Sequence, residues 1–157
     1  MGYTHYWDRP DEISVEHFDQ IRDDLAVALP ALTELTGTLE ILISDETITI
    51  NGVGDAGHET FVLERIESED WRFCKTARKP YDTAVCFALI IAQYYCPEFR
   101  VSTDGDNDDE GWVQAREILA DMGSADAIWS RITREGKLVF DKIECVEENG
   151  NITFKRI

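Results

Sequence analysis

One stretch near the middle of the chain constrains the fold more than any other. Residues 84–92 read AVCFALIIA and offer no polar side chain to water. A helix that is apolar on nearly all sides belongs in a protein core. Pro80 suits the first position of a helix and Pro97 cannot continue one, so we predict a buried helix over about residues 80–96. It is too short for a membrane span, which needs about 20 apolar residues.

Hydrophobic periodicity predicts two further helices. Apolar residues at helical spacing follow Ser14, a good N-cap residue, and we expect this helix to end near Pro30 or one turn later. A second apolar stripe begins at Trp112 and stops before Gly123, which suits the left-handed position after a helix. Residues 125–135 give no clear pattern.

Alternating and β-branched runs predict the strands. The first ten residues carry aromatic side chains on both faces of an extended segment, which is typical of an interior strand. The pair Asn149-Gly150 is a strong turn signal and predicts a C-terminal β-hairpin. The other expected strands cover residues 38–44, 47–50, 60–66, 71–74, 99–102, 138–146 and 152–157.

These elements favour the α+β class. We expect a single domain over residues 1–157, with a mixed, largely antiparallel sheet, about three helices and the central helix buried. The chain has 157 residues, of which 43% are hydrophobic, and a chain of this length can bury about 70% of its unfolded surface. No stretch near the N-terminus resembles a signal peptide, so we expect a cytoplasmic protein.

The charge of the chain limits its partners. Its formal charge is −17, from 32 acidic and 15 basic residues. Such a surface repels nucleic acids and anionic membranes, so we expect direct contact with neither. Three explanations of the acidity stay open: a solubilising surface, adaptation to high salt, and imitation of a phosphate array that blocks the basic groove of a host protein.

Positive charge is concentrated just before the predicted central helix. Lys75, Arg78 and Lys79 fall within five residues, where free backbone N–H groups and the helix dipole already favour an anion. One interpretation is a phosphate or carboxylate site, and the other is that Arg78 pairs with Asp82 or another acid and fixes the loop. We expect a pocket where this segment meets the first strand. The residues expected to bind a ligand there are Tyr3, His5, Trp7, Lys75, Arg78, Lys79, Tyr81 and Asp82.

Cys74 is the candidate nucleophile. Its basic neighbours would lower the pKa of a thiol and make it reactive, although a packed, inert thiol is the alternative. A catalytic site would combine Cys74 with His5 and Asp82. The sequence leaves open whether the protein is an enzyme.

No metal site or cofactor is predicted. The four cysteines have neither the spacing of a zinc ribbon nor that of a disulfide framework. Asp104, Asp106 and Asp108 lack the glycine and glutamate that a calcium loop places after them, and His58-Glu59 alone is a weak signal. Nucleotide-binding glycine motifs do not occur in the sequence either, so any cofactor stays unknown.

Several motifs resemble a family of small uncharacterised proteins from tailed bacteriophages, other viruses and some bacterial and archaeal genomes. The motifs are GYTHYW at residues 2–7, FCKTARKPYD at residues 73–82 and VSTDG at residues 101–105. The resemblance covers most of residues 1–122 and leaves the C-terminal hairpin outside. The family has no established activity, so the resemblance implies a viral setting, and a host cytoplasm, rather than a reaction.

Three functional hypotheses follow from the sequence. The first is an acidic accessory protein that binds a nucleotide-like or phosphate-like anion near residues 75–82 and acts as a binding or regulatory module. The second is a small enzyme that uses the same pocket. The third is an acidic mimic of nucleic acid that inhibits a host protein. The first two predict a concave polar site, whereas the third predicts a broad surface of carboxylates.

Overall fold

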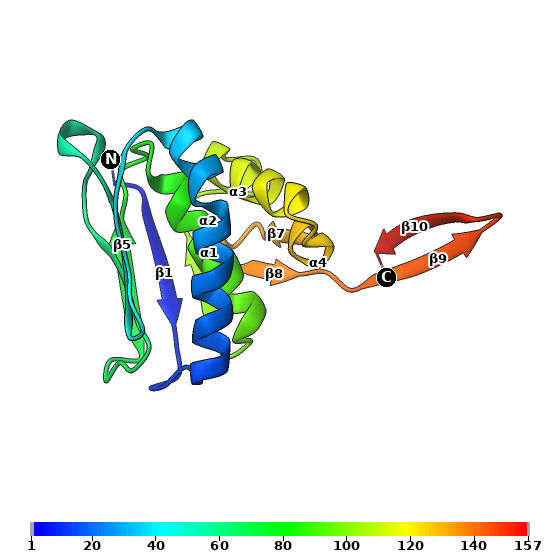
Figure 1. Cartoon of the computed structure of the whole chain (residues 1–157), viewed down its shortest axis with the longest axis horizontal. Helices are drawn as coiled ribbons and strands as arrows, with labels where there is room; N and C mark the ends of the chain where they lie inside the picture. The colour runs from blue at the N-terminus through cyan, green and yellow to red at the C-terminus, as the bar shows by residue number, and fades with distance from the viewer. Residues whose placement is uncertain (1, 157) are drawn as a thin grey trace.

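The strands and the helices of this protein occupy separate layers (Figure 1). The structure is a computed structural model that describes residues 2–156, apart from the side chains of residues 125, 145, 154 and 156. A strand layer lies on one side, and the long helices cover one face of it (Figure 1). These helices are α1 (Val15–Thr36), α2 (Asp82–Tyr95) and α3 (Glu110–Asp121). The α+β class predicted from the sequence is confirmed.

The first sheet of the strand layer has β1 (Thr4–Asp8) at its centre. This strand pairs antiparallel with β5 (Trp71–Lys75) on one side and with β6 (Arg100–Thr103) on the other. The first ten residues therefore supply an interior strand, as predicted. Because β1 is central, its core-facing side chains lie close to both neighbouring strands.

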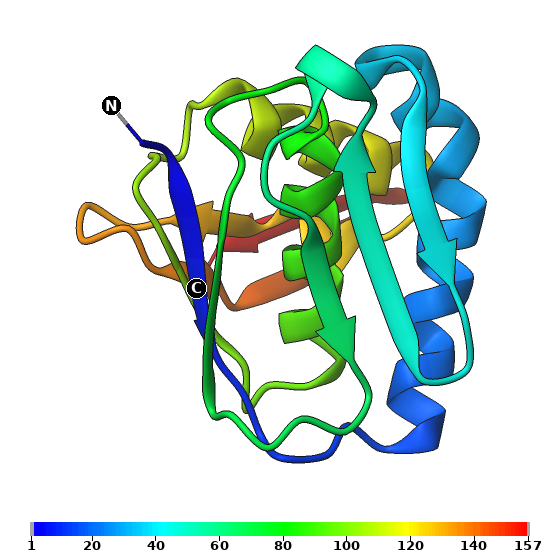
Figure 2. The ribbon, with the colours of Figure 1, turned by 90° about the vertical axis from the view of Figure 1, so that its left-hand side faces the viewer.

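The second sheet is an antiparallel meander that lies beside the first (Figure 2). Ile48 and Ile50 are buried and alternate with partly exposed residues, so one face of this sheet packs on the core. The elements are β2 (Leu39–Ile43), β3 (Thr47–Gly52), η1 (Gly54–Ala56) and β4 (Phe61–Glu64). A short 3₁₀ turn lies in the connection between β3 and β4.

The central helix α2 is buried along most of its length. Every residue from Asp82 to Ala92 is buried, which confirms the prediction from the apolar run. The helix begins at Asp82 rather than at Pro80, because Tyr81 takes the N-cap position. Among the described helices, α2 included, none has both the length and the apolarity that crossing a membrane requires.

The helix α1 runs further than the sequence indicated. Ser14 caps it as predicted, and its hydroxyl accepts the backbone N–H of His17 at 3.1 Å. The helix continues past Pro30, which is exposed, and ends at Thr36. Burial of Leu32 and Thr36 extends the core-facing stripe, and this packing outweighs the single hydrogen bond that proline removes.

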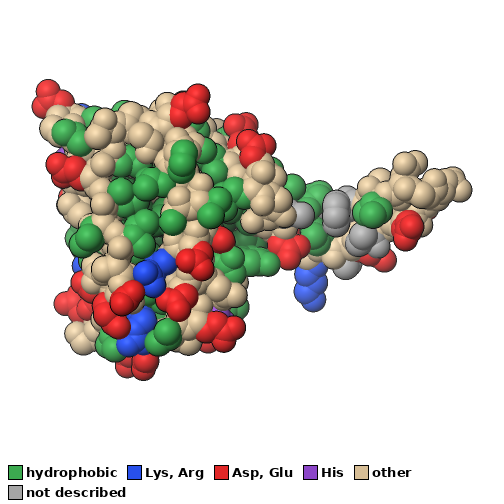
Figure 3. All heavy atoms as spheres, viewed as in Figure 1, with side chains coloured by type: hydrophobic (Ala, Val, Ile, Leu, Met, Phe, Trp, Pro, Cys, Tyr) green, Lys and Arg blue, Asp and Glu red, His purple; other side chains and the backbone are tan. Residues whose placement is uncertain are grey.

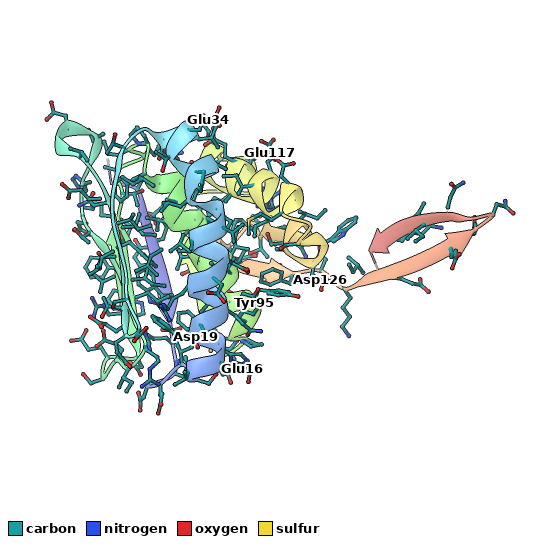
Figure 4. All side chains as sticks on the ribbon, viewed as in Figure 1. Glu16, Asp19, Glu34, Tyr95, Glu117 and Asp126 are labelled. Atoms are coloured by element: carbon teal, nitrogen blue, oxygen red, sulfur yellow. The ribbon has the colours of Figure 1, made fainter. Side chains whose placement is uncertain are left out.

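Acidic side chains mark the outer side of the helical layer. Figure 4 shows Glu16 and Asp19 on α1 and Glu117 on α3, and all three are exposed. Asp24 of α1 has a structural role at the boundary between α1 and α2, because it accepts a hydrogen bond from the Tyr95 hydroxyl of α2 at 2.5 Å. This bond fixes the end of the buried helix against its neighbour.

The segment after α3 forms a small helix and a small sheet. Residues 125–135, ambiguous in the sequence, contain α4 (Ala125–Ile128) and β7 (Ser130–Ile132). β7 pairs with β8 (Leu138–Phe140), and a bridge from Ser102 to Lys137 attaches this sheet to β6. The single strand predicted over residues 138–146 is therefore interrupted after Phe140.

The C-terminal hairpin predicted from Asn149-Gly150 is confirmed. β9 (Ile143–Glu148) pairs with β10 (Asn151–Arg156), and both turn residues have the positive φ that a tight hairpin turn needs. The hairpin projects away from the layers of the fold (Figure 1). An isolated two-stranded hairpin is at best marginally stable in water, so its contribution to the stability of the fold should be small.

Removal of this hairpin tests that inference. We expect a chain that ends at Lys142 to keep its free energy of unfolding within about 0.5 kcal/mol of the full chain, because exposed segments outside the core contribute little. Urea unfolding followed by tryptophan fluorescence measures the difference. A control chain that ends at Gly136 also loses the buried Leu138 and should lose at least about 2 kcal/mol. Equal losses in the two truncated chains would show that the hairpin belongs to the core.

Candidate functional site

A hydrogen-bonded pair, His5 and Asp82, joins the central strand to the start of the central helix. His5 Nε2 lies 2.6 Å from Asp82 Oδ1, and the imidazole is fully buried. Asp82 is the first residue of α2 and is 7% exposed. Its carboxylate is therefore almost enclosed by protein but still reaches the surface. Both residues were site candidates from the sequence, and the structure brings them together.

Two threonines complete the hydrogen bonding of this pair. Thr76 Oγ1 donates to Asp82 Oδ1 at 2.6 Å, and His5 Nδ1 lies 2.8 Å from Thr103 Oγ1. Thr103 Oγ1 also accepts the backbone N–H of Gly105 at 3.0 Å. Both ring nitrogens of His5 thus have partners, as buried polar atoms require.

The Asp82 carboxylate is held in its ionised form. Burial is the largest influence and would raise its pKa, but the hydrogen bonds from His5, Thr76 and Cys86 together outweigh it, and the pKa is lowered. Oδ1 accepts two short hydrogen bonds, whereas the only side chain that donates to Oδ2 among the described residues is the Cys86 thiol, at 3.6 Å. Oδ2 therefore keeps acceptor capacity for a ligand.

Cys86 and Gly111 close the cluster around Asp82. Cys86 Sγ lies 3.7 Å from His5 Nε2, and burial raises the pKa of this thiol well above its usual value. Gly111 of α3 packs directly on the carboxylate, since a Cβ atom at this position would lie 2.3 Å from Asp82 Oδ2. Only glycine lets α3 approach the site this closely.

A pocket of about 300 Å³ opens beside Asp82. The first turns of α2 and α3 form two of its walls, and the segment just before α2 forms a third. Its lining is mainly polar and includes Thr83 and Gln114, whose side chains are joined by a 2.7 Å hydrogen bond. The predicted site residues that line it are Tyr3, Arg78, Lys79 and Asp82.

Charges of both signs surround this pocket. The Arg78 guanidinium carbon lies 4.0 Å from the centroid of the Tyr3 ring, and its Nη1 lies 3.4 Å from Asp109 Oδ1. This contact is the acidic pairing of Arg78 that was one interpretation of the sequence. The Arg78 side chain is 60% exposed, so the pair contributes only about 0–1 kcal/mol. Lys79 forms no ion pair within the part of the chain that the structure describes.

A strained turn presents Arg78 to the pocket. Ala77 and Arg78 have φ values of 53° and 57°, and the Lys79 N–H donates to the Thr76 carbonyl at 3.0 Å. Two positive φ values inside such a turn suit glycine or asparagine, and residues with larger side chains pay about 1–2 kcal/mol each. The Tyr3 carbonyl accepts the N–H groups of both Thr76 and Ala77, which holds the turn in place.

Two of the predicted ligand-binding residues belong to the core. Trp7 is 1% exposed and packs against Phe61 at a centroid distance of 5.2 Å. Tyr81 is fully buried, and its hydroxyl donates to the backbone carbonyl of Glu59. Neither residue lines the pocket. Their aromatic side chains stabilise the layers that carry the site.

Lys75 also lies outside the pocket. It is an exposed residue at the end of β5, and its side chain passes close to Gly2. The cations that share the pocket are therefore Arg78 and Lys79 rather than all three residues of the basic cluster. His5 does not line the pocket, but it contacts two residues that do: Asp82 through the hydrogen bond and Tyr3 through an edge-on ring contact at a centroid distance of 5.1 Å.

Of the two interpretations of Cys74, the structure fits the packed, inert thiol and not the activated nucleophile. Cys74 is 1% exposed, and its Sγ donates to the backbone carbonyl of Glu59 at 3.5 Å. Burial, with the Glu59 carboxylate as the next cause, raises its pKa to about 12. Lys75 and Arg78 are exposed while Cys74 faces the core, so adjacency in sequence does not place their charges on the thiol. The thiol that contacts His5 belongs to Cys86.

Sequence reasoning missed four residues of the cluster around His5 and Asp82, and it missed the polar residues that α3 adds to the pocket. Thr76 and Thr103 stand in the FCKTARKPYD and VSTDG motifs, where they were noted but given no role. Cys86 stands four residues after Asp82, a spacing that places both on one face of a helix. Gly111 gave no signal, because its importance arises only from the approach of α3.

Alkylation tests the buried state of Cys74. At pH 8, we expect iodoacetamide to leave Cys74 unmodified in the native protein, because a thiol whose pKa is about 12 is almost fully protonated and this one is enclosed. Peptide mapping by mass spectrometry measures the modified fraction, with urea-unfolded protein as the control that reacts fully. Modification of native Cys74 at the rate of a free thiol would restore it as a candidate nucleophile.

Comparison with known proteins adds no family to these observations. The chain matches no protein-family model, no curated protein and no solved structure. The phage and viral resemblance of its motifs therefore stays a prediction, and its function is inferred from the geometry of the site.

Proposed function

We propose that this protein is a small accessory protein of the phage or viral type that binds a small anionic molecule in the pocket beside Asp82. The observation that carries the proposal is the pocket of about 300 Å³ with Arg78 and Lys79 at its edge and a fixed carboxylate, Asp82, in its wall. The viral setting rests on the resemblance of the sequence motifs alone.

The charges around the pocket favour a ligand with two different ends. Arg78 and Lys79 suit a phosphate or carboxylate group. Three carboxylates, those of Asp82, Asp109 and Glu110, also line the pocket and would repel a bare, highly charged anion. Hydroxyl or amino groups at the other end of the ligand would donate hydrogen bonds to these carboxylates. A sugar phosphate or a nucleoside monophosphate has both kinds of group.

The size of the pocket supports the same class of ligand. Small-molecule sites span about 300–1,000 Å³, and this pocket lies at the lower limit of that range. A molecule the size of a mononucleotide is therefore favoured over a polymer. The Thr83 and Gln114 side chains add neutral hydrogen-bonding groups that can orient such a ligand.

A small enzyme is the second candidate function, and the His5–Asp82 pair is the observation that favours it. Asp82 lines the pocket while His5 and Thr76 fix its orientation, as a general base requires. Such an enzyme would use Asp82 to accept a proton from a ligand hydroxyl. Cys74 has no part in it, because the thiol is enclosed in the core.

The third hypothesis, an acidic mimic of nucleic acid, receives less support. It predicts a broad array of carboxylates and no pocket. On the face shown in Figure 3, Asp and Glu side chains occur in small groups separated by hydrophobic and neutral atoms. A pocket with both signs of charge is also present.

A pair of alanine substitutions tests the proposed binding site. We expect ribose 5-phosphate or a ribonucleoside monophosphate to raise the melting temperature of the wild type. A ligand at 100 times its Kd adds about 2.7 kcal/mol to stability. The variant Arg78→Ala/Lys79→Ala should lose this protection and, without ligand, keep its stability within about 1 kcal/mol, because exposed ion pairs contribute little. Thermal denaturation measures both effects.

Lys75→Ala is the matched control, since it removes a cation of the same cluster that lies outside the pocket. It should keep the full protection. Two results would contradict the proposal: no probe protects the wild type, or the double variant loses several kcal/mol without ligand. The second result would mean that Arg78 and Lys79 serve as structural ion pairs.

A further inference from the structure

Three side chains with metal-binding atoms meet beneath the wall of the pocket. His5, Asp82 and Cys86 each offer one such atom, and these atoms lie within 4.8 Å of one another. His5 comes from β1, while Asp82 and Cys86 stand one turn apart on α2. The cluster therefore offers one nitrogen, one oxygen and one sulfur from two rigid elements.

Two of the distances between ligand atoms in this cluster already match those of a tetrahedral metal site. Metal–ligand distances of about 2.0–2.3 Å place neighbouring ligand atoms roughly 3.3–3.8 Å apart. Cys86 Sγ lies 3.7 Å from His5 Nε2 and 3.6 Å from Asp82 Oδ2. The 2.6 Å contact between Nε2 and the other carboxylate oxygen, Oδ1, is a hydrogen bond, and it must lengthen or break when a metal ion takes the place of its proton on Nε2.

The surroundings of the cluster suit a metal ion. Thr103 holds His5 by Nδ1 and so directs Nε2 toward Asp82 and Cys86, and Thr76 holds the Asp82 carboxylate. Ligating histidines and carboxylates usually have such outer partners. A neutral imidazole, a carboxylate and a thiolate together carry two negative charges, which a divalent ion neutralises inside the core.

We propose that His5, Asp82 and Cys86 bind one divalent transition-metal ion of the zinc class, with a fourth coordination position open toward the pocket. Imidazole and thiolate select such ions, whereas Mg²⁺ and Ca²⁺ prefer oxygen ligands. Binding forms three metal–ligand bonds. The S–H bond of Cys86 breaks and its proton passes to solvent, while His5 ligates through an Nε2 that carries no proton, as a neutral imidazole whose proton is on Nδ1 beside Thr103 Oγ1. The ion enters by way of Asp82 and Gly111, which line the pocket.

This inference does not depend on the anionic ligand proposed above. It departs from the sequence-based expectation that the chain has no metal site, since a set of ligands split between residue 5 and the pair 82 and 86 matches no compact motif. Asp82 belongs to both proposed sites, so each site is tested with its own probe and with substitutions of residues that the other site does not use.

Titration of the reduced, chelator-treated protein with Co²⁺ tests the proposal. We expect one equivalent to bind and to give a thiolate-to-cobalt charge-transfer band together with the intense visible bands of a tetrahedral site. Zn²⁺ should displace the cobalt and remove both. Thr103→Val, which removes the hydroxyl that orients His5, should weaken cobalt binding about 10- to 100-fold and leave the bands otherwise unchanged.

Substitutions at two cysteines decide which thiol is responsible. Cys86→Ser should fold, as circular dichroism can check, and should lose the charge-transfer band; Cys86→Ala provides the same test if the serine variant is unstable. Cys74→Ala, which removes another buried thiol, should keep the band. The proposal is overturned if the wild type gives no band, if the band survives both substitutions of Cys86, or if Cys74→Ala abolishes it.

Discussion

The hydrogen bond between His5 and Asp82 is the interaction on which the candidate site depends. It places an imidazole and a carboxylate inside an apolar region, where an unpaired polar group costs several kcal/mol. Each partner must therefore be satisfied by groups from other elements. Thr103 of β6 satisfies His5, and Thr76 of the turn before α2 satisfies Asp82. One buried pair thus fixes the central strand, an edge strand, a turn and a helix relative to one another.

The same constraint explains how a pocket forms beside a closed core. Asp82 begins α2, so its backbone lies at the edge of the buried layer while its side chain is held by β1. Gly111 lets α3 pack directly on the carboxylate, and the strained turn at Ala77 and Arg78 places a cation in the lining of the same pocket. Function, rather than packing alone, is a common reason for backbone strain and a close glycine contact.

Local patterns in the sequence predicted the fold well, and they predicted the site only in part. The buried helix, the interior first strand and the Asn149-Gly150 hairpin follow from periodicity and turn chemistry, which act over a few residues. The predicted end of α1 near Pro30 was too early, because burial of the turn after Pro30 in the core outweighed the local preference of proline for a helix end. The alternative of an activated Cys74 fails because neighbours in sequence point to opposite sides of a strand. The contacts of His5 with Asp82 and Thr103 span 77 and 98 residues, and no local pattern specifies pairings at such separations.

A double-mutant cycle on His5 and Asp82 tests the central claim most directly. His5→Phe and Asp82→Asn, singly and together, are compared by the free energy of unfolding in urea. Because the bond is buried and involves a charged carboxylate, the account predicts a coupling of about 1.5–3 kcal/mol between the two substitutions. Additive effects, within about 0.5 kcal/mol, would contradict it and would show that the two side chains are packed near each other without holding the site together.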